Sequence, residues 1–399
     1  MSIFASVAGV VAAAPIQQVA EQGGSNWLVT IGVFLLMLGM LVVVHELGHL
    51  LVALWMGIKV EEFGVGFPPR ALTLFERSGV KYTLNWLPLG GFVRFAQGGE
   101  GVGETLYGAG GSLAAAPPLR KIAVMVAGPL MNLLLAMLIF GALFSFLGVP
   151  TPTGGQVISQ IYADTPAAQA GFKPGDVVMR LDGRPLDDTN LVGEVARANP
   201  GQPVEAVVLR EGQELTLSVT PGPWQAPDGT QYDSGFGFSY GPQVEQVRVG
   251  PLEAFGRGVT YSIDLTGRML KSLAGLPASV FGIFSSTPSP DGEPIGPVGI
   301  ARATGEVIQQ PGGFAAFWNL TAVLSLNLFL LNLLPIPALD GSHIIFALVE
   351  WLRGGKKVPP EKEALVHAIG FAALMGLMLL ITVNDVINAF QGTPVLGGG

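Results

Sequence analysis

The sequence predicts a polytopic α-helical membrane protein with four transmembrane helices, an inserted extracytoplasmic α/β domain and a membrane-associated β-hairpin. The first observation is a charged fraction of only 13% beside a hydrophobic fraction of 49%, where soluble domains carry about 25% charged residues. The second is that four windows lack Asp, Glu, Lys, Arg and His entirely: Gln22–Val44, Ile122–Ala163, Val307–Leu339 and Ala368–Asn384. This composition argues against a wholly soluble enzyme, and the net charge of −8 argues against a nucleic-acid partner.

About 20 apolar residues are needed for a helix to cross the core of a bilayer. We therefore expect membrane spans near Trp27–Trp55, Ile122–Gly148, Phe314–Val349 and Leu365–Phe390. A set of buried core helices is the alternative, which four segments of this length disfavour. The apolar segment Met1–Pro15 resembles a signal peptide but has no basic residue, so we interpret it as a tail.

The positions of Lys and Arg predict the orientation of these spans. Basic residues gather between the first and second spans and between the third and fourth, and neither terminal tail contains one. The positive-inside rule then places both basic loops in the cytoplasm and both termini outside it. The long segment between the second and third spans must therefore be extracytoplasmic, because long translocated domains are largely exempt from the rule.

These features divide the chain into four parts. Residues 1–150 hold the first two spans and a cytoplasmic β-loop, and residues 151–222 read as a small α/β domain with a hairpin at Val204–Arg210 and Glu214–Thr220. Residues 223–310 form a linker in which Leu252–Ser286 predicts either an amphipathic helix at the membrane surface or an ordinary domain helix. Residues 311–399 hold the last two spans.

Within the first part, Lys59–Gly64 and Tyr82–Arg94 alternate as strands do, with Ser78-Gly79 as a turn. We interpret them as a hairpin that dips toward the membrane and offers a sheet edge to an unwound substrate segment. A cytoplasmic loop domain with no such role is the alternative.

The first span contains the sequence His45-Glu46-Leu47-Gly48-His49. Residues four apart lie on one face of a helix, so both imidazoles can reach one metal ion while Glu46 lies beside it as a base. A single buried histidine is usually a satisfied core residue. That role does not account for two histidines and a glutamate inside an apolar run, where ionisable groups are costly.

A catalytic zinc ion usually has three protein ligands, so a third must come from elsewhere in the chain. Glu61 and Glu62 are close enough in sequence but lie beyond the span. Asp340 is the better candidate, because it follows the apolar stretch that contains Pro335 and Pro337, and a carboxylate at that depth needs a partner. A helix N-cap is the alternative role for Asp340 and is compatible with metal binding.

The two motifs together resemble the site-2 protease family of intramembrane zinc metalloproteases, and in particular its bacterial regulator-of-sigma-E protease branch. The resemblance rests on His45–His49, on Asn332-x-x-Pro-x-Pro-x-Leu-Asp-Gly341 and on four shorter stretches, and it extends from about Trp27 to Phe390. The shorter stretches are Phe63–Arg70, Pro88–Arg94, Ala127–Asn132 and Gly296–Ala301. Separately, Ala167–Val178 and the Leu181-Asp-Gly that follows it resemble PDZ domains of bacterial proteases.

The family resemblance implies Zn2+ held by His45, His49 and Asp340, with Glu46 as catalytic base and Asn332 as a catalytic residue that holds substrate or the oxyanion. It implies a multi-pass protein of the bacterial inner membrane that cuts transmembrane segments of single-span proteins in regulated intramembrane proteolysis, such as an anti-sigma factor or remnant signal peptides. The PDZ resemblance implies binding of a peptide or free C-terminus; a spacer domain without a ligand is the alternative.

Two departures from the family pattern stand out. Several relatives carry two tandem PDZ domains, whereas only one is recognisable here. The loop Gln97–Pro118 is rich in Gly and Ala and lacks an acidic stretch. Two other functions also remain open, namely a metal-binding or ion-transporting membrane protein and a non-catalytic PDZ scaffold.

Overall fold

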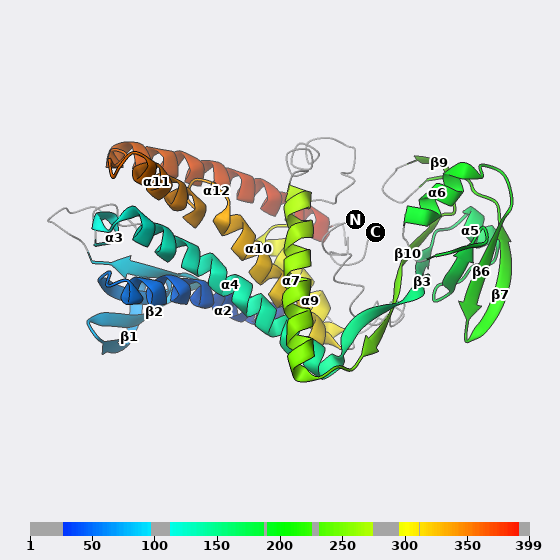
Figure 1. Ribbon diagram of the computed structural model, residues 1–399, viewed down its shortest axis with the longest axis horizontal. Coiled ribbons are helices and arrows are strands. Elements are labelled where there is room, and N and C mark those ends of the chain that lie inside the picture. The colour runs from blue at the N-terminus through cyan, green and yellow to red at the C-terminus, as the bar shows by residue number, and fades with distance from the viewer. Residues whose placement is uncertain are drawn as a thin grey trace.

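The computed structural model describes residues 27–96, 112–186, 190–225, 231–273, 295–310 and 312–390. Figure 1 shows long helices and one hairpin at one end of the molecule and a β-rich domain at the other. The predicted tail Met1–Pro15, most of the loop Gln97–Pro118 and the later part of Leu252–Ser286 lie outside the described residues.

Four described helices are long and apolar enough to cross a membrane. They are α2 (Trp27–Trp55), α4 (Pro118–Leu147), α10 (Gly313–Leu333) and α12 (Pro360–Phe390). The four predicted spans therefore correspond to four helices, and the first has the bounds expected. Helix α4 is central, since it packs against α2, α10, α11 (Asp340–Leu352) and α7 (Pro251–Leu273).

The predicted third span near Phe314–Val349 consists of two helices, which are separated at the two prolines. Helix α10 ends at Leu333 and α11 begins at Asp340. Pro335 and Pro337 have no N–H to donate within a helix, and Ala338 has a φ of 75°, a left-handed conformation that non-glycine residues rarely adopt. The helix is therefore broken here, and Asp340 occupies the first turn of a new helix.

Two shorter helices complete this end of the molecule. Helix α9 (Pro297–Gln309) packs against α2, α10 and α12, while α3 (Ser112–Ala115) is a single turn before α4. The buried carboxylate of Asp385, on α12, accepts the backbone N–H groups of Gly296 and Gly299 at 3.3 and 2.8 Å. This contact satisfies N–H groups that the first turn of α9 leaves without helical partners.

The predicted hairpin is confirmed as the antiparallel pair β1 (Val60–Arg77) and β2 (Val80–Phe95). Ser78 and Gly79 both have positive φ angles, 54° and 80°, as a type I′ hairpin turn requires. Val60, Phe63 and Val80 of the hairpin are buried in one core with α2, whereas other positions expose large apolar side chains: Leu72, Leu74, Phe75, Leu84, Trp86 and Leu87. An exposed apolar patch of this kind marks an interaction surface for protein or membrane.

The β domain is built on one antiparallel sheet with the strand order β10-β3-β4-β6-β7, and its short strand β5 pairs with β4. Its strands are β3 (Val149–Ile161), β4 (Val177–Leu181), β5 (Arg184–Pro185), β6 (Val204–Arg210), β7 (Gln213–Val219) and β10 (Phe238–Val247), with β8 (Gly222–Gln225) and β9 (Gln231–Gly235) as a separate pair. Helices α5 (Pro166–Gln169) and α6 (Asn190–Ala198) complete the domain, and its core includes Ile158, Val178 and Val208.

The sheet extends beyond the segment 151–222 that the sequence assigns to this domain. Strand β10 pairs with β3 along its length, from Phe238 beside Ile161 to Val247 beside Val149. These two long strands connect the domain to α4 on one side and α7 on the other (Figure 1). Composition alone does not reveal β10, because the strand returns to its partner from about 80 residues away.

Candidate metal centre

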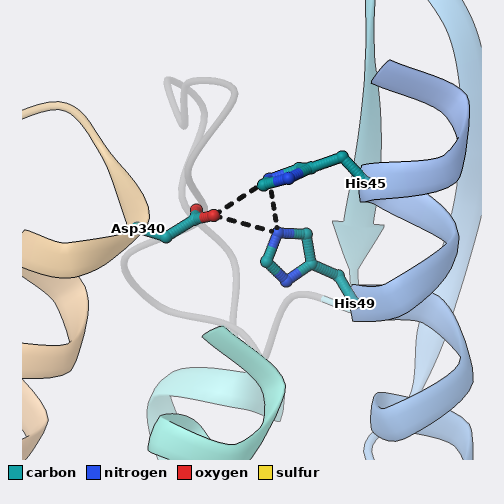
Figure 2. A group of neighbouring side chains, drawn as sticks. All are labelled: His45, His49 and Asp340. Atoms are coloured by element: carbon teal, nitrogen blue, oxygen red, sulfur yellow. Dashed lines mark hydrogen bonds and ion pairs between the residues drawn. The ribbon is translucent and has the colours of Figure 1, made fainter. Parts of the chain in front are cut away.

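The two histidines of the first motif lie one turn apart on α2 and project to the same side (Figure 2). Both are buried, and the side chain of Asp340 reaches them from the start of α11. Its Oδ2 atom lies 2.9 Å from Nε2 of His45 and 3.3 Å from Nε2 of His49, and the two Nε2 atoms are 3.2 Å apart. The structure therefore brings together the three residues that the sequence predicts as metal ligands.

These separations fit a zinc ion. Zn–N and Zn–O bonds of about 2.0–2.2 Å in a tetrahedron place ligand atoms roughly 3.3 Å from one another. Three protein ligands leave a fourth position for water or substrate, which is the arrangement of catalytic rather than structural zinc sites.

The His49 ring is oriented by α4. Its Nδ1 lies 2.8 Å from the backbone carbonyl of Val124, which can only accept a hydrogen bond. The proton is therefore on Nδ1, and the lone pair of Nε2 faces Asp340. Ligating histidines commonly donate their second nitrogen to such an acceptor, which fixes the ring and its tautomer.

The His45 ring is oriented by Asn132, also on α4, whose side-chain amide lies 3.2 Å from Nδ1. Asn132 is fully buried, and its Oδ1 atom has no hydrogen-bond partner. If the side-chain amide of Asn132 is rotated by half a turn, its Oδ1 accepts the Nδ1–H of His45. Nε2 of His45 then has a free lone pair with which to bind a metal. The position of Asn132 Oδ1 therefore suits a His45 that is protonated on Nδ1 and binds a metal through Nε2.

Gly128 lets α4 approach the two imidazoles. A Cβ atom on this residue would overlap Nε2 of His49 and lie 2.9 Å from Nε2 of His45. Sequence reasoning did not single out Gly128 or Asn132 as site residues. The available signal was a glycine and an amide inside an apolar span, where each is costly unless it has a role.

Glu46 is separate from the three ligands and lies toward β2. A Cβ atom on Gly91 would lie 3.2 Å from Cγ of Glu46, and the carboxyl group hydrogen-bonds the backbone of Val93. The glutamate therefore lies between the ligand face of α2 and the hairpin.

Two other residues considered at the sequence level are placed elsewhere. Asn332 lies half-buried in the last turn of α10, and none of the hydrogen bonds among the described residues joins it to the three ligands. Glu62 is buried in the hairpin, where its carboxylate accepts from Arg70, Arg94 and Thr83, each at 2.8 Å. Glu62 is therefore a structural partner of two arginines.

Comparison with known families decides which class of metal centre this is. The sequence model for Peptidase family M50 matches residues 33–377. The chain belongs to this family. A relative from Rhizobium meliloti is 33% identical over 90% of this chain and 97% of its own length.

Relatives named for their activity agree with the family. Zinc metalloprotease RasP of Oceanobacillus iheyensis is 29% identical over 91% of this chain and its whole length. Regulator of sigma-W protease RasP of Bacillus subtilis is 30% identical over 90% of this chain and 99% of its own length. The chain is thus a zinc metalloprotease of the M50 family, and these relatives do not resolve the sigma-E branch from the sigma-W branch.

Among solved structures, the HtrA-type protease AlgW with a decapeptide matches at 39% identity and a TM-score of 0.17. The match covers 20% of this chain and 24% of that one. Because so little of either chain is covered, the M50 assignment rests on the full-length relatives.

Proposed function

We propose that this M50 protease hydrolyses peptide bonds within the membrane-spanning segments of other proteins, at a zinc ion held by His45, His49 and Asp340. The observation that carries the proposal is the convergence of three ligand atoms, from two helices far apart in sequence, at 2.9–3.3 Å from one another. Two of these ligands belong to an apolar helix long enough to span a bilayer.

Each residue then has a chemical task. When bound, zinc acts as a Lewis acid on the scissile carbonyl and makes water a stronger acid. Glu46, beside the ligand face, takes the proton from the attacking water and passes it to the leaving amine. Val124 and Asn132 hold the two imidazoles with their Nε2 atoms toward the metal. Asn332 is assigned to hold the substrate or the oxyanion, a role that the family resemblance supports.

The hairpin would hold the substrate in an extended form. A helix must unwind before a protease can reach its backbone, and the bilayer core offers no water to satisfy the freed groups. Strand β2 passes beside Glu46 at Gly91 and Val93, so a segment paired with this strand would lie next to the catalytic base. The exposed apolar residues of the hairpin, such as Leu72, Phe75 and Trp86, support its insertion into the membrane surface.

The same proposal includes the finer predictions from sequence. The chain would be a multi-pass protein of the bacterial inner membrane, with its termini and β domain outside the cytoplasm, as the positions of Lys and Arg favour. Its substrates would be single-span proteins cut in regulated intramembrane proteolysis, such as an anti-sigma factor or remnant signal peptides. The β domain would act as a PDZ module that binds a peptide or a C-terminus, which its sequence between Thr153 and Gly222 supports.

The test compares the wild type with Glu46→Gln, each purified in detergent and incubated with a panel of single-span membrane proteins tagged at both ends. We expect the wild type to cut at least one member and Glu46→Gln to cut none, because the amide cannot accept the proton. The zinc content of the variant, measured by elemental analysis, should equal that of the wild type. Glu61→Gln, on the exposed face of β1, is the matched control and should remain active.

Retained proteolysis in Glu46→Gln would overturn the assignment of the base. A purified chain without zinc would instead favour the scaffold alternative. If zinc-dependent ion transport persisted in Glu46→Gln and no substrate were cut by either protein, the transporter alternative would replace the protease.

A further inference from the structure

All four histidines of the chain belong to clusters of two imidazoles and one carboxylate. The second cluster contains His343, in the first turn of α11, with Glu363 and His367 on successive turns of α12. One ligand atom from each of these residues lies within 4.8 Å of the others. None of the three takes part in the metal centre described above.

The side chains of this cluster lie near enough to one another to share an ion. Oε1 of Glu363 lies 3.7 Å from Nδ1 of His343 and 4.0 Å from Nε2 of His367. Both are longer than a hydrogen bond and wider than the roughly 3.3 Å that separates ligands of one tetrahedral zinc ion, so the three side chains would draw together around an ion. The two imidazole rings are stacked with their centroids 4.3 Å apart, and both lie beside the same carboxylate.

His367 has a buried nitrogen with nothing to bond. Its Nε2 atom is inaccessible to solvent and has no hydrogen-bond partner in the described part of the chain, although the side chain as a whole is 18% exposed. A buried polar atom without a partner is costly, and a bound ion, which the neighbouring ligands favour, would remove that cost. From these contacts we infer that His343, Glu363 and His367 form a second site for a divalent metal ion of the zinc type.

The hydrogen bonds of His367 show which contacts would change when a metal ion binds to its Nε2 atom. Its Nδ1 accepts the backbone N–H of Ala338 at 3.1 Å, so the neutral ring carries its proton on Nε2. A metal ion at Nε2 takes the place of that proton, which moves to Nδ1. Oγ of Ser342, 3.4 Å from Nδ1, can then accept it, because this hydroxyl already donates to the carbonyl of Leu339.

Metal at His367 and the hydrogen bond from Ala338 therefore exclude each other. Ala338 is two residues before Asp340 and has the strained φ of 75°. Occupancy of the second site would thus release one restraint on the turn that carries the third ligand of the first site. Metal binding itself does not depend on the proposed protease function, since no residue is shared.

The chemistry of the ligands indicates the ion. Two imidazoles and one carboxylate suit Zn2+, whereas Mg2+ and Ca2+ prefer all-oxygen sites.

The test counts metal equivalents on the full-length chain in detergent, equilibrated with buffered free Zn2+ and measured by elemental analysis. We expect the wild type to bind two equivalents at saturation. His45→Gln with His49→Gln should bind one, held at the second site, and His343→Gln with His367→Gln should also bind one, held at the first. Two equivalents on the latter protein, or a single equivalent on the wild type, would overturn the inference.

A milder variant keeps the test decisive if either double variant fails to fold. Glu363→Gln retains the shape of the side chain but weakens a charged ligand, so the second equivalent should bind at least 10-fold more weakly. Glu361→Gln, exposed on the first turn of the same helix, is the control and should bind both equivalents as the wild type does. An unchanged second affinity in Glu363→Gln would contradict the site.

Discussion

The metal centre depends on Gly128 having no side chain, because α4 approaches both imidazoles at this residue. The histidines themselves are evident from the sequence, because ionisable groups in an apolar run are costly unless they bind a partner such as a metal ion. Asp340 could also be predicted, since its position after two prolines indicated a break in a span. Gly128 and Asn132 could not, because their roles depend on how closely α4 approaches α2, and no local pattern specifies that distance.

Replacing Gly128 with alanine should disable the centre without unfolding α4. The added Cβ would overlap His49 and crowd His45, so both rings must move from their ligand positions. We expect a loss of zinc affinity of at least 10-fold and a parallel loss of cleavage. Gly39→Ala on α2, where a Cβ meets nothing within 4 Å, is the control and should bind zinc normally. Normal zinc binding by Gly128→Ala would show that the site is wider than described.

Asn132→Ala tests the orientation of His45. The ring would lose its only described partner at Nδ1, and changes of this kind typically weaken metal binding by about 10- to 100-fold. Zinc affinity measured by competition with a chelator gives the readout. Asn327→Ala serves as the comparison, because among the described residues that amide bonds the Val323 carbonyl of its own helix. Equal affinities in the two variants would remove Asn132 from the centre.

At the scale of elements, hydropathy and charge predicted the helices well but the packing between them poorly. The absence of charge identified α2 and α4 to within a few residues, since a bilayer demands that pattern. The alternation of β1 and β2 and the Ser78-Gly79 turn identified the hairpin. The break between α10 and α11 could be expected from Pro335 and Pro337, because proline has no N–H to donate within a helix.

The contact between α12 and α9 is an element-scale feature that can be measured. Asp385 is buried and accepts two N–H groups at the start of α9, so Asp385→Ala leaves both without their partner. Hydrogen bonds to charged groups contribute about 1.5–3 kcal/mol each, and a lower Tm in detergent is expected. Asp264→Ala, on the exposed face of α7, should leave Tm unchanged. A Tm equal to that of the wild type in Asp385→Ala would show that solvent reaches this helix end.

At the scale of the whole molecule, the apolar helices and the β1–β2 hairpin meet at one metal centre. The apolar helices bring His45, His49 and Asp340 together, and the hairpin extends from the same helix to present β2 beside Glu46. The β domain lies at the far end, joined through β3 and β10 (Figure 1). The sequence predicts the apolar helices and the β domain, but the predicted domain ends at residue 222. Strand β10, which pairs with β3 in its sheet, comes from a later part of the chain.

The central claim is that zinc-dependent cleavage takes place within a membrane-spanning segment. The most direct measurement reconstitutes the protease in liposomes with a single-span substrate and maps the new termini by mass spectrometry. We predict cuts inside the apolar segment of the substrate, lost on treatment with a chelator, restored by Zn2+ and absent with Glu46→Gln. Cuts confined to the water-exposed flanks, or cuts that persist in Glu46→Gln, would contradict the account.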